Sequence, residues 1–396
     1  MDIVSRFKDK KVLLWGYGAE GKSSENFLKR ACETACIAVY EGNREELPLN
    51  EYDIIIKSPG VPGNFRAEPK ITSQTQLFLE AFGDRTIGIT GTKGKSTTTA
   101  MLYAVLNENL PEGACLLGNI GLPCLDAYED MRDSKKIAVY EMSCHQLFNN
   151  TVSPHIAIFL NLFEDHLDYY GTRENYFMAK SHIARHQSLS DYLIAGSTVP
   201  FIETKAQRID IADVNEYKYE MNVLGIHNQF NAEVIFEVAT KLYGLSEEGV
   251  LKSIKEFKAL PHRLQYFGTY NGVKYYDDSI STIPEATISA LESVPDTKTV
   301  IVGGMDRGID YSVLIEGIRE RKDVNFICCY ESGEHVYSEV SELDNTYYVP
   351  DLKEAVKLAK EKTTAGSVVL SPAAASYGYF KNFMERGEVF QALVKG

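Results

Sequence analysis

The chain has 396 residues, of which 44% are hydrophobic and 24% are charged, and its formal net charge is −14. This composition is typical of a soluble globular protein, and the length predicts two or three domains. The negative charge argues against a nucleic-acid-binding surface, and no apolar run approaches the roughly 20 residues that span a bilayer. We therefore expect neither nucleic acid nor a membrane as a partner.

Two features of the sequence argue against secretion. The N-terminal sequence MDIVSRFKDKK lacks the apolar core of a signal peptide, which predicts a cytoplasmic location. The seven cysteines are odd in number and show no paired short spacing, so they indicate neither a disulfide framework nor a zinc site. Cys328 and Cys329 lie in an apolar run and are expected to be buried thiols.

Short apolar segments alternate with helical segments along the whole chain. Examples of the predicted strands are KVLLWG, YDIIIKSPG, KIAVYEM, IAIFLNL, TVIVGG and SVVLSP. This alternation predicts an α/β fold with mainly parallel sheets. We expect three domains, at residues 1–84, 85–259 and 260–396, the third of which opens with a hairpin signal, YNGV.

The first glycine-rich turn, GYGAEG, places Gly16, Gly18 and Gly21 between a predicted strand and a predicted helix. Glu41 ends the next strand, 20 residues after Gly21. This is the dinucleotide-binding pattern, but a full dinucleotide fold needs two mononucleotide halves and this domain has room for one. The turn therefore favours a single nucleoside diphosphate over NAD, and the alternative is a tight turn without a ligand.

A second glycine-rich segment, GITGTKGKSTTTA at 88–100, follows a strand pattern and precedes a helix pattern. Backbone N–H groups and the helix dipole make such a turn an anion site. Lys95 could reach terminal phosphates, and the Ser96 hydroxyl could join a Mg²⁺ shell. Only two residues separate Gly91 from Gly94, which is more compact than the usual P-loop. We interpret the segment as a nucleoside triphosphate site; the alternative is a coincidental glycine-rich turn.

Acidic residues and a histidine follow two later predicted strands. Glu141 ends KIAVYEM, and NLFEDHLDYYG supplies His166 between Glu164 and Asp168. The carboxyl ends of parallel strands form the ligand-binding edge of such a sheet, so these groups could hold Mg²⁺. The charged loop could equally be a solvated turn, and Lys180, on a predicted helix, could be an ordinary surface lysine.

The order of motifs along nearly the whole chain resembles that of the Mur ligases, most of all the glutamate-adding members. The matching segments are GITGTKGKSTTT, GNIG, EMSCHQL, NLFEDHLDYYGTRENYFMAK, GIHNQFNA, LPHRLQ, YDDSISTIPEA, VGGMDRGIDYS and LSPAAASYGYFKNFMERGEVF. The phosphate loop alone is less specific, because folylpolyglutamate synthases share it.

The resemblance implies a Rossmann-like UDP-binding domain, a central P-loop ATPase domain and a Rossmann-like C-terminal domain that closes on the nucleotide and binds the amino acid. It implies ATP-dependent addition of glutamate, expected to be the D-isomer, to UDP-N-acetylmuramoyl-L-alanine through an acyl phosphate, in peptidoglycan precursor synthesis. Such chemistry needs charge neutralisation and alignment of two anions, with no enzyme nucleophile. A monomer is expected.

The resemblance also assigns roles by motif position. The ATP-binding set is Gly91, Thr92, Lys93, Gly94, Lys95, Ser96, Thr97, Asn228, Asn231, Arg263 and Asp278. The Mg²⁺-binding set is Ser96, Glu141, His166 and Lys180, with Lys180 expected as a CO₂-derived carbamate. The catalytic set is Lys95, His166 and Lys180. The set for the UDP-linked substrate is Gly16, Gly18, Gly21, Glu41, Gly42, Asn119 and Gln146. The glutamate-binding set is Thr282, Arg307, Ser376 and Phe383.

Four positions depart from the pattern of glutamate-adding members. Ile280 and Ile283, in DSISTIPEA, stand where lysine and asparagine are typical. Arg307 stands where lysine is common and could grip a carboxylate with two hydrogen bonds. His145 stands where phenylalanine is more common. Because some relatives with this pattern add L-glutamate, the stereochemistry of the amino acid stays open.

Two other hypotheses compete with this interpretation. One is another ATP-dependent amide ligase, such as a folate-polyglutamating enzyme, although the N-terminal nucleotide domain argues against it. The other is a catalytically silent nucleotide-binding scaffold. Retention of Lys95, Glu141, His166 and Lys180 argues against a silent protein.

Overall fold

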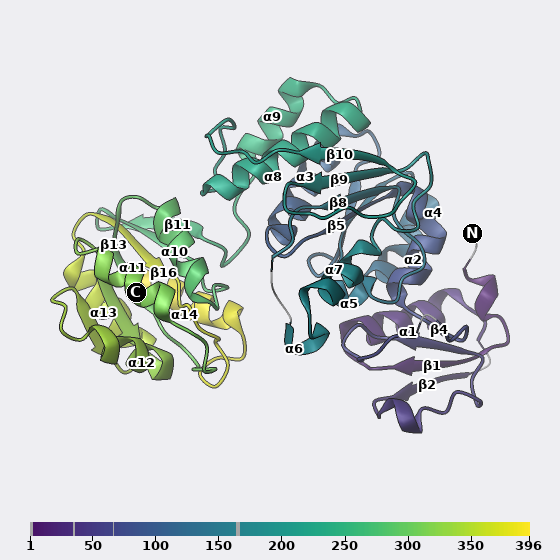
Figure 1. The fold of residues 1–396 in the computed structure, drawn as a ribbon, viewed down its shortest axis with the longest axis horizontal. Coiled ribbons are helices and arrows are strands. Elements are labelled where there is room, and N and C mark those ends of the chain that lie inside the picture. Colours follow the sequence, from purple (N-terminus) through teal and green to yellow (C-terminus); the bar gives the residue numbers. More distant parts are fainter. Residues whose placement is uncertain (1–2, 35, 66, 164–166) are drawn as a thin grey trace. The chain divides into compact units, whose positions relative to one another are not determined.

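The computed structural model describes residues 3–34, 36–65, 67–163 and 167–396. Within these ranges the chain forms three β-sheets, each flanked by helices (Figure 1), which confirms the α/β prediction. The chain separates into two compact units. One is Met1–Glu220 with Gln229–Lys255, and the other is Met221–Asn228 with Glu256–Gly396. The first unit contains two of the sheets, and the domain boundaries at 84/85 and 259/260 stay predictions.

The N-terminal sheet has four parallel strands in the order β2-β1-β3-β4. Its strands and helices are β1 (Lys11–Trp15), α1 (Ala19–Ala31), β2 (Cys36–Tyr40), β3 (Ile54–Lys57), β4 (Ile71–Thr72) and α2 (Gln74–Phe82). Strands β1 and β3 are almost wholly buried because their residues are apolar up to Lys57. Ser73 is the N-cap of helix α2, and its hydroxyl accepts a hydrogen bond from the Gln76 backbone N–H.

The central sheet has six parallel strands in the order β10-β9-β8-β5-β7-β6. Its strands are β5 (Thr86–Thr90), β6 (Ala114–Gly118), β7 (Ile137–Glu141), β8 (Ile156–Phe159), β9 (Tyr192–Gly196) and β10 (Gln207–Ile211). The accompanying helices are α3 (Lys95–Asn109), α4 (Tyr128–Asp133), α5 (Cys144–Leu147), α6 (Leu167–Tyr170), α7 (Arg173–Ser181), α8 (Ile226–Glu237) and α9 (Glu247–Glu256). The chain leaves β5 toward β6 but later returns to β8 on the opposite side of β5. The loops after β5 and β8 therefore flank a topological switch point, where α/β sheets bind ligands.

The C-terminal sheet has six strands in the order β11-β12-β16-β13-β14-β15, and β11 is antiparallel to β12. Its strands are β11 (Gln265–Tyr270), β12 (Val273–Asp277), β13 (Thr297–Val302), β14 (Asn325–Cys329), β15 (Thr346–Val349) and β16 (Gly366–Leu370). Its helices are α10 (Pro284–Ser293), α11 (Ser312–Glu320), α12 (Tyr330–Val340), α13 (Leu352–Lys362) and α14 (Phe383–Lys395). The YNGV hairpin is confirmed, with Asn271 and Gly272 both at positive φ between β11 and β12. Cys328 and Cys329 are buried in β14, as predicted.

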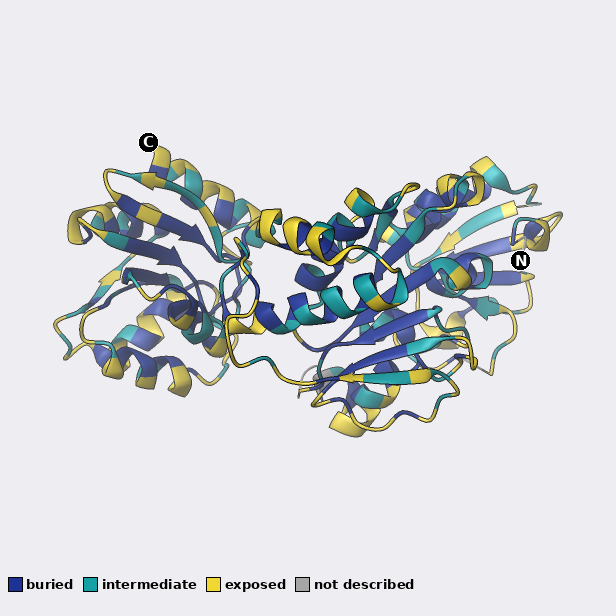
Figure 2. Ribbon diagram, turned by 90° about the horizontal axis from the view of Figure 1, so that it is seen from above, coloured by how far each residue is buried: buried dark blue, intermediate teal, exposed yellow. Residues whose placement is uncertain are grey.

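The first two sheets share one apolar core. Leu14, Phe27 and Phe78 of the N-terminal domain lie in the same buried cluster as Leu125 and Tyr140 of the central domain. In Figure 2 the strands are mainly buried, and the outward faces of the helices are exposed. This common core holds the N-terminal glycine turn against the central domain, which places residues of both domains in one site.

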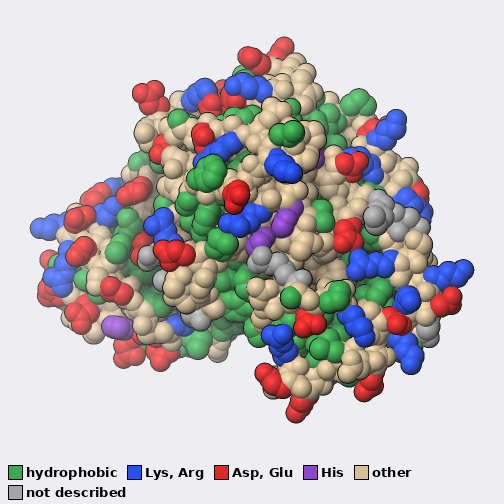
Figure 3. Space-filling model, turned by 45° about the vertical axis from the view of Figure 1, so that its right-hand side comes forward, with side chains coloured by type: hydrophobic (Ala, Val, Ile, Leu, Met, Phe, Trp, Pro, Cys, Tyr) green, Lys and Arg blue, Asp and Glu red, His purple; other side chains and the backbone are tan. Residues whose placement is uncertain are grey.

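No helix in the described part of the chain combines the length and the apolar character needed to cross a membrane. On the face drawn in Figure 3, acidic and basic side chains are interspersed.

Candidate active site

The phosphate loop, Gly91 to Gly94, connects β5 to α3. Gly94 is the N-cap of α3 and has φ +83°, in the left-handed region that favours glycine. A Cβ atom at this position would also lie 3.0 Å from Oδ1 of Asn231 on α8. The N-terminus of α3, a helix of 15 residues, therefore faces this loop with its backbone N–H groups, as a phosphate site requires.

Asn161, directly after β8 and Leu160, holds the phosphate loop in shape. Its Oδ1 accepts hydrogen bonds from the backbone N–H groups of Thr92 (3.1 Å) and Lys93 (2.9 Å), and its Nδ2 donates to the Lys93 carbonyl (3.1 Å). Asn161 is the asparagine of the NLFEDH motif, and no role was predicted for it. The signal was present, because an amide after a strand at the switch point can pair with a neighbouring loop.

Two lysines meet at the first glycine of the loop. Lys95 Nζ donates to the carbonyl oxygens of Gly91 (2.9 Å) and Thr92 (3.0 Å). Lys180 Nζ, from α7, donates to the same Gly91 oxygen at 2.8 Å and lies 4.7 Å from the centre of the Tyr176 ring. Lys180 is only 1% exposed, so it is not a surface lysine.

Ser96 and Glu141 form the part of the predicted metal set that the structure brings together. The Ser96 hydroxyl donates to Glu141 Oε1 at 3.1 Å, and Glu141 is 2% exposed at the end of β7. One hydroxyl and one buried carboxylate beside a phosphate loop suit Mg²⁺, which usually takes few protein ligands and completes its shell with phosphates and water. His166 lies outside the described residues, and the described residues contain no group of three or more His, Cys, Asp or Glu placed to hold a metal.

The remaining nucleotide residues are divided between the two units. Thr97 and Asn231 are buried near the loop in the first unit, Thr97 on α3 and Asn231 on α8. Asn228 belongs to the second unit and donates from Nδ2 to the Leu224 carbonyl at 2.6 Å. Arg263 and Asp278 also lie in the second unit, where the charge of Arg263 acts on Asp278.

Asp278 is a buried carboxylate with three donors. It accepts hydrogen bonds from the hydroxyls of Ser281 and Ser371 and from the backbone N–H of Leu264. Burial raises the pKa of Asp278 to about 6, while the hydrogen bonds and Arg263 act in the opposite direction. Its preceding neighbour, Asp277, bonds His262 Nδ1 at 2.7 Å, and this bond raises the pKa of His262.

The four predicted glutamate-binding residues belong to the second unit. Arg307 donates to the Thr282 carbonyl at 3.3 Å, Ser376 is buried, and Phe383 begins α14. The backbone oxygen of Phe383 accepts a bond from Ser279 at 2.8 Å. The structure thus brings Arg307 to Thr282.

Arg386, which the sequence analysis did not single out, lies buried beneath this region. It donates to Ser279 through Nε and Nη2, at 3.0 and 2.7 Å, and to the Ala374 carbonyl at 3.0 Å. Burial lowers its pKa to about 10. A charged residue amid the buried positions of the MERGEVF helix was the available signal, and the structure makes it a brace between the loop after β12 and the loop after β16.

The N-terminal glycine turn is as tight as its sequence predicts. Gly16 has φ +87°, and a Cβ atom at Gly21 would lie 2.4 Å from the Gly16 carbonyl oxygen, so only glycine fits there. Gly18 is the N-cap of α1. At the same edge of the sheet, Glu41 is exposed after β2, and the Gly42 carbonyl accepts a bond from Trp15 Nε1 at 3.0 Å.

Gln146 connects this turn to the central domain, whereas Asn119 is exposed in the turn after β6. The Gln146 Nε2 donates to Glu20 Oε1 on α1 at 2.7 Å, and its Oε1 accepts from the Ser143 backbone N–H at 2.8 Å. Burial raises the pKa of Glu20, and burial also lowers the pKa of Lys57, at the end of β3, to about 8.

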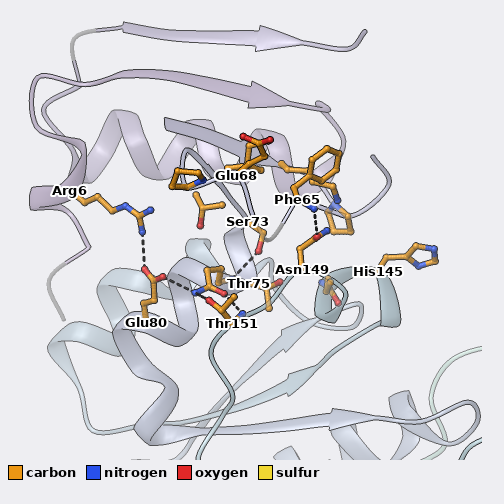
Figure 4. Close-up of a pocket in the computed structure, with 16 residues that line it drawn as sticks. Arg6, Phe65, Glu68, Ser73, Thr75, Glu80, His145, Asn149 and Thr151 are labelled. Atoms are coloured by element: carbon orange, nitrogen blue, oxygen red, sulfur yellow. Dashed lines mark hydrogen bonds and ion pairs between the residues drawn. The ribbon is translucent and has the colours of Figure 1, made fainter. Parts of the chain in front are cut away.

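A cavity of about 190 Å³ lies beside these groups, between the N-terminal and central domains. Figure 4 shows Arg6 and Glu80 paired at one end and Phe65, Asn149 and His145 at the other. Lys57 and Gln146 also line it. His145 packs edge-on against the Tyr169 ring, with centroids 4.6 Å apart, which is the kind of contact that an aromatic residue makes at this position.

A P-loop at the switch point of a parallel sheet, with a buried lysine and a hydroxyl–carboxylate pair beside it, is the arrangement of an α/β protein that binds a nucleoside triphosphate with Mg²⁺. Two family models match the chain: the Mur ligase middle domain at residues 89–214 and the Mur ligase glutamate ligase domain at residues 262–374. The chain belongs to the Mur ligase family.

Individual relatives match over almost the full length. The chain is 34% identical to a UDP-N-acetylmuramoylalanine--D-glutamate ligase of Aquifex aeolicus, with 97% of this chain and 98% of that protein covered. It is 32% identical to the enzyme of the same name from Streptococcus agalactiae, with 98% of each covered. Among solved structures, UDP-N-acetylmuramate-alanine ligase MurC of Thermotoga maritima has the same fold, with a TM-score of 0.65, 17% identity, and 98% of this chain and 99% of that one covered.

Proposed function

We propose that this protein joins D-glutamate to UDP-N-acetylmuramoyl-L-alanine at the expense of ATP, in peptidoglycan precursor synthesis. The observation that carries the proposal is the identity to D-glutamate ligases along 97–98% of the chain, which spans all three sheets. A folate-polyglutamating enzyme is disfavoured, because the N-terminal domain and its glycine turn are part of that match.

The described residues around the phosphate loop support phosphoryl transfer to a carboxylate. The N-terminus of α3 and Lys95 would hold the terminal phosphates of ATP, and Ser96 with Glu141 would hold Mg²⁺, which offsets phosphate charge. The substrate carboxylate attacks the γ-phosphorus, and ADP leaves. The protein then needs only to hold the acyl phosphate in place and exclude water until the glutamate amine binds.

The second step needs the amino acid to be aligned by its carboxylates. Arg307 can donate two parallel hydrogen bonds to one carboxylate, and Thr282, Ser376 and Phe383 would complete this pocket. The glutamate amine attacks the acyl carbon, phosphate leaves, and an amide bond forms. His166 would supply a further metal ligand.

Lys180 is the proposed site of a carbamate. In this modification a neutral amine attacks the carbon of CO₂, an N–C bond forms, and one proton is released, so no oxidant or reductant is needed. The burial of Lys180 and its contact with the phosphate loop support the proposal, since a carbamate there would provide an anionic oxygen ligand for Mg²⁺ beside that loop. We also propose a cytoplasmic, monomeric enzyme.

The experiment that tests the function is ADP release with ATP, Mg²⁺ and UDP-N-acetylmuramoyl-L-alanine, compared for D-glutamate, L-glutamate and no amino acid. Turnover with D-glutamate alone is expected. The side chains of Ile280 and Ile283 make L-glutamate the second candidate, because a cation and an amide typical of D-glutamate-adding members are replaced there by apolar groups. Turnover with L-glutamate alone would assign that isomer, and ADP release with neither would contradict the proposed function.

A further inference from the structure

Gln146 is held at both ends of its carboxamide. It lies in α5 and is 5% exposed. Its Oε1 is occupied by the backbone N–H of Ser143, so its Nε2 must point the other way, toward Glu20. A carboxamide nitrogen carries two hydrogens, and one of them is used by Glu20. The direction of the other N–H is therefore fixed by the same two bonds.

Glu20 is placed to impose this orientation from another domain. It lies in the first turn of α1, two residues after the N-cap Gly18, where a carboxylate is favoured by the helix dipole. Its second oxygen, Oε2, is buried and has no hydrogen-bond partner among the described residues. A buried carboxylate with one unpaired oxygen is costly, so packing alone does not explain its presence here.

The positive charge of Lys57 stabilises the buried carboxylate of Glu20. Lys57 is 5% exposed at the end of β3, and its Nζ donates to the Ser58 carbonyl at 3.1 Å. The ammonium acts on Glu20 through space. Lys57 and Gln146 both line the cavity between the N-terminal and central domains.

We propose that Glu20 is a positioning residue for the UDP-linked substrate: it orients the carboxamide of Gln146 so that the remaining Nε2–H faces that substrate. This inference rests on the proposed function, because it takes Gln146 to be a contact of UDP-N-acetylmuramoyl-L-alanine. Glu20 itself acts through Gln146.

The test is steady-state kinetics with each substrate varied in turn. Glu20→Ala is expected to raise the KM for UDP-N-acetylmuramoyl-L-alanine by about tenfold, the loss of one charge-assisted hydrogen bond, with the KM values for ATP and glutamate unchanged. Glu20→Gln should restore most of the affinity, because its amide oxygen can still accept from Gln146. Glu20→Asp, which keeps the charge but shortens the reach, should behave like Glu20→Ala.

Ser23→Ala is the matched control. Ser23 lies one turn further along α1 and is buried, and its hydroxyl donates to Asp126 of the central domain at 2.8 Å. It therefore removes a bond between the same two domains without touching Gln146. If Ser23→Ala raises the KM for UDP-N-acetylmuramoyl-L-alanine by the same factor, Glu20 only stabilises the contact between the two domains. That result would overturn the inference. A Glu20→Gln variant as weak as Glu20→Ala would overturn it too.

If Glu20→Ala does not fold, the comparison of Glu20→Asp with Glu20→Gln decides the question, since a positioning role requires Glu20→Gln to be the better binder. Calorimetric binding of UDP-N-acetylmuramoyl-L-alanine separates the two proposals. No binding by the wild type would overturn the proposed function and this inference with it. Binding that Glu20→Ala leaves unchanged would overturn this inference alone.

Discussion

The Ser96 hydroxyl and the Glu141 carboxylate, 3.1 Å apart, join the first turn of α3 to the end of β7. These two residues come from adjacent strand–loop connections of the central sheet, where β5 pairs with β7. The pair therefore sits at the carboxyl edge of the sheet, where a bound nucleotide would need its cation.

Loss of this pair should weaken the response to Mg²⁺. Glu141→Gln is expected to raise the Mg²⁺ concentration for half-maximal ADP release by about tenfold or more, and Ser96→Ala should act in the same direction, because a metal ligand or its partner is lost. A Mg²⁺ titration of activity at saturating ATP measures this. Unchanged half-maximal concentrations in both variants would remove Glu141 from the metal site.

Lys180→Ala is expected to lower kcat by at least about a hundredfold, because the proposed carbamate ligand of Mg²⁺ is lost. High bicarbonate should not restore activity, since no amine remains. Lys180→Arg, which keeps a positive charge but cannot form a carbamate, should be equally impaired. A ¹³C carbamate signal from labelled bicarbonate should be present in the wild type and absent in Lys180→Ala. Near-native turnover of Lys180→Arg would contradict the carbamate.

Asn161→Ala should loosen the phosphate loop. It removes two bonds accepted from Thr92 and Lys93 and one donated to Lys93, so the KM for ATP is expected to rise by about tenfold. Asn149→Ala is the control, because Asn149 bonds a different loop through the Phe65 N–H and the Gly63 carbonyl. The KM for ATP should not change in that control. A rise of equal size in both variants would point to general destabilisation.

These residues also show what a sequence can and cannot reveal. The phosphate loop was predictable because its signal is local: a strand, glycines with fixed conformations and a helix lie within a few residues. Asn161 pairs with residues 68 and 69 positions away, and Gln146 with Glu20 across 126 positions. Such pairs depend on how strands are ordered in the sheet and on which domains share a core. Periodicity and spacing do not contain that information.

The burial of charge was the least predictable property of the chain. Lys180, Lys57 and Arg386 all read as ordinary surface cations by residue type, yet each is nearly inaccessible. Lys180 was identified through the family resemblance alone, and the other two were not identified. The ligand-binding and catalytic roles assigned to all of the site residues stay predictions.

Asp278 should make stability fall as the pH rises through the weakly acidic range. Its pKa is about 6 in the folded chain and 3.8 as an ordinary carboxyl, so the folded state holds the proton more tightly. The contribution of the Asp278 carboxyl to the free energy of unfolding is fully present below pH 4 and is lost by about pH 6. This is a change of about 3 kcal/mol. The stability of the Asp278→Asn variant should not show this decrease.

Thermal unfolding of the full chain between pH 4 and 7 checks the sign. The difference in unfolding temperature, Asp278→Asn minus wild type, is expected to increase as the pH rises, most steeply between about pH 4 and 6. Midpoints that keep a constant separation over this range would show that burial does not raise the pKa of this carboxyl.

The carbonyl oxygen of Gly91 accepts hydrogen bonds from both Lys95 and Lys180, at 2.9 and 2.8 Å. Two ammonium groups that share one acceptor repel each other, and the repulsion is strong where water is scarce. Carbamylation of Lys180 would exchange this repulsion for attraction, because it turns one of the two cations into an anion. The modification would then have a consequence beyond metal binding: it would tie α7 to the phosphate loop. Carbon dioxide would act as a structural ligand of the loop before any substrate arrives.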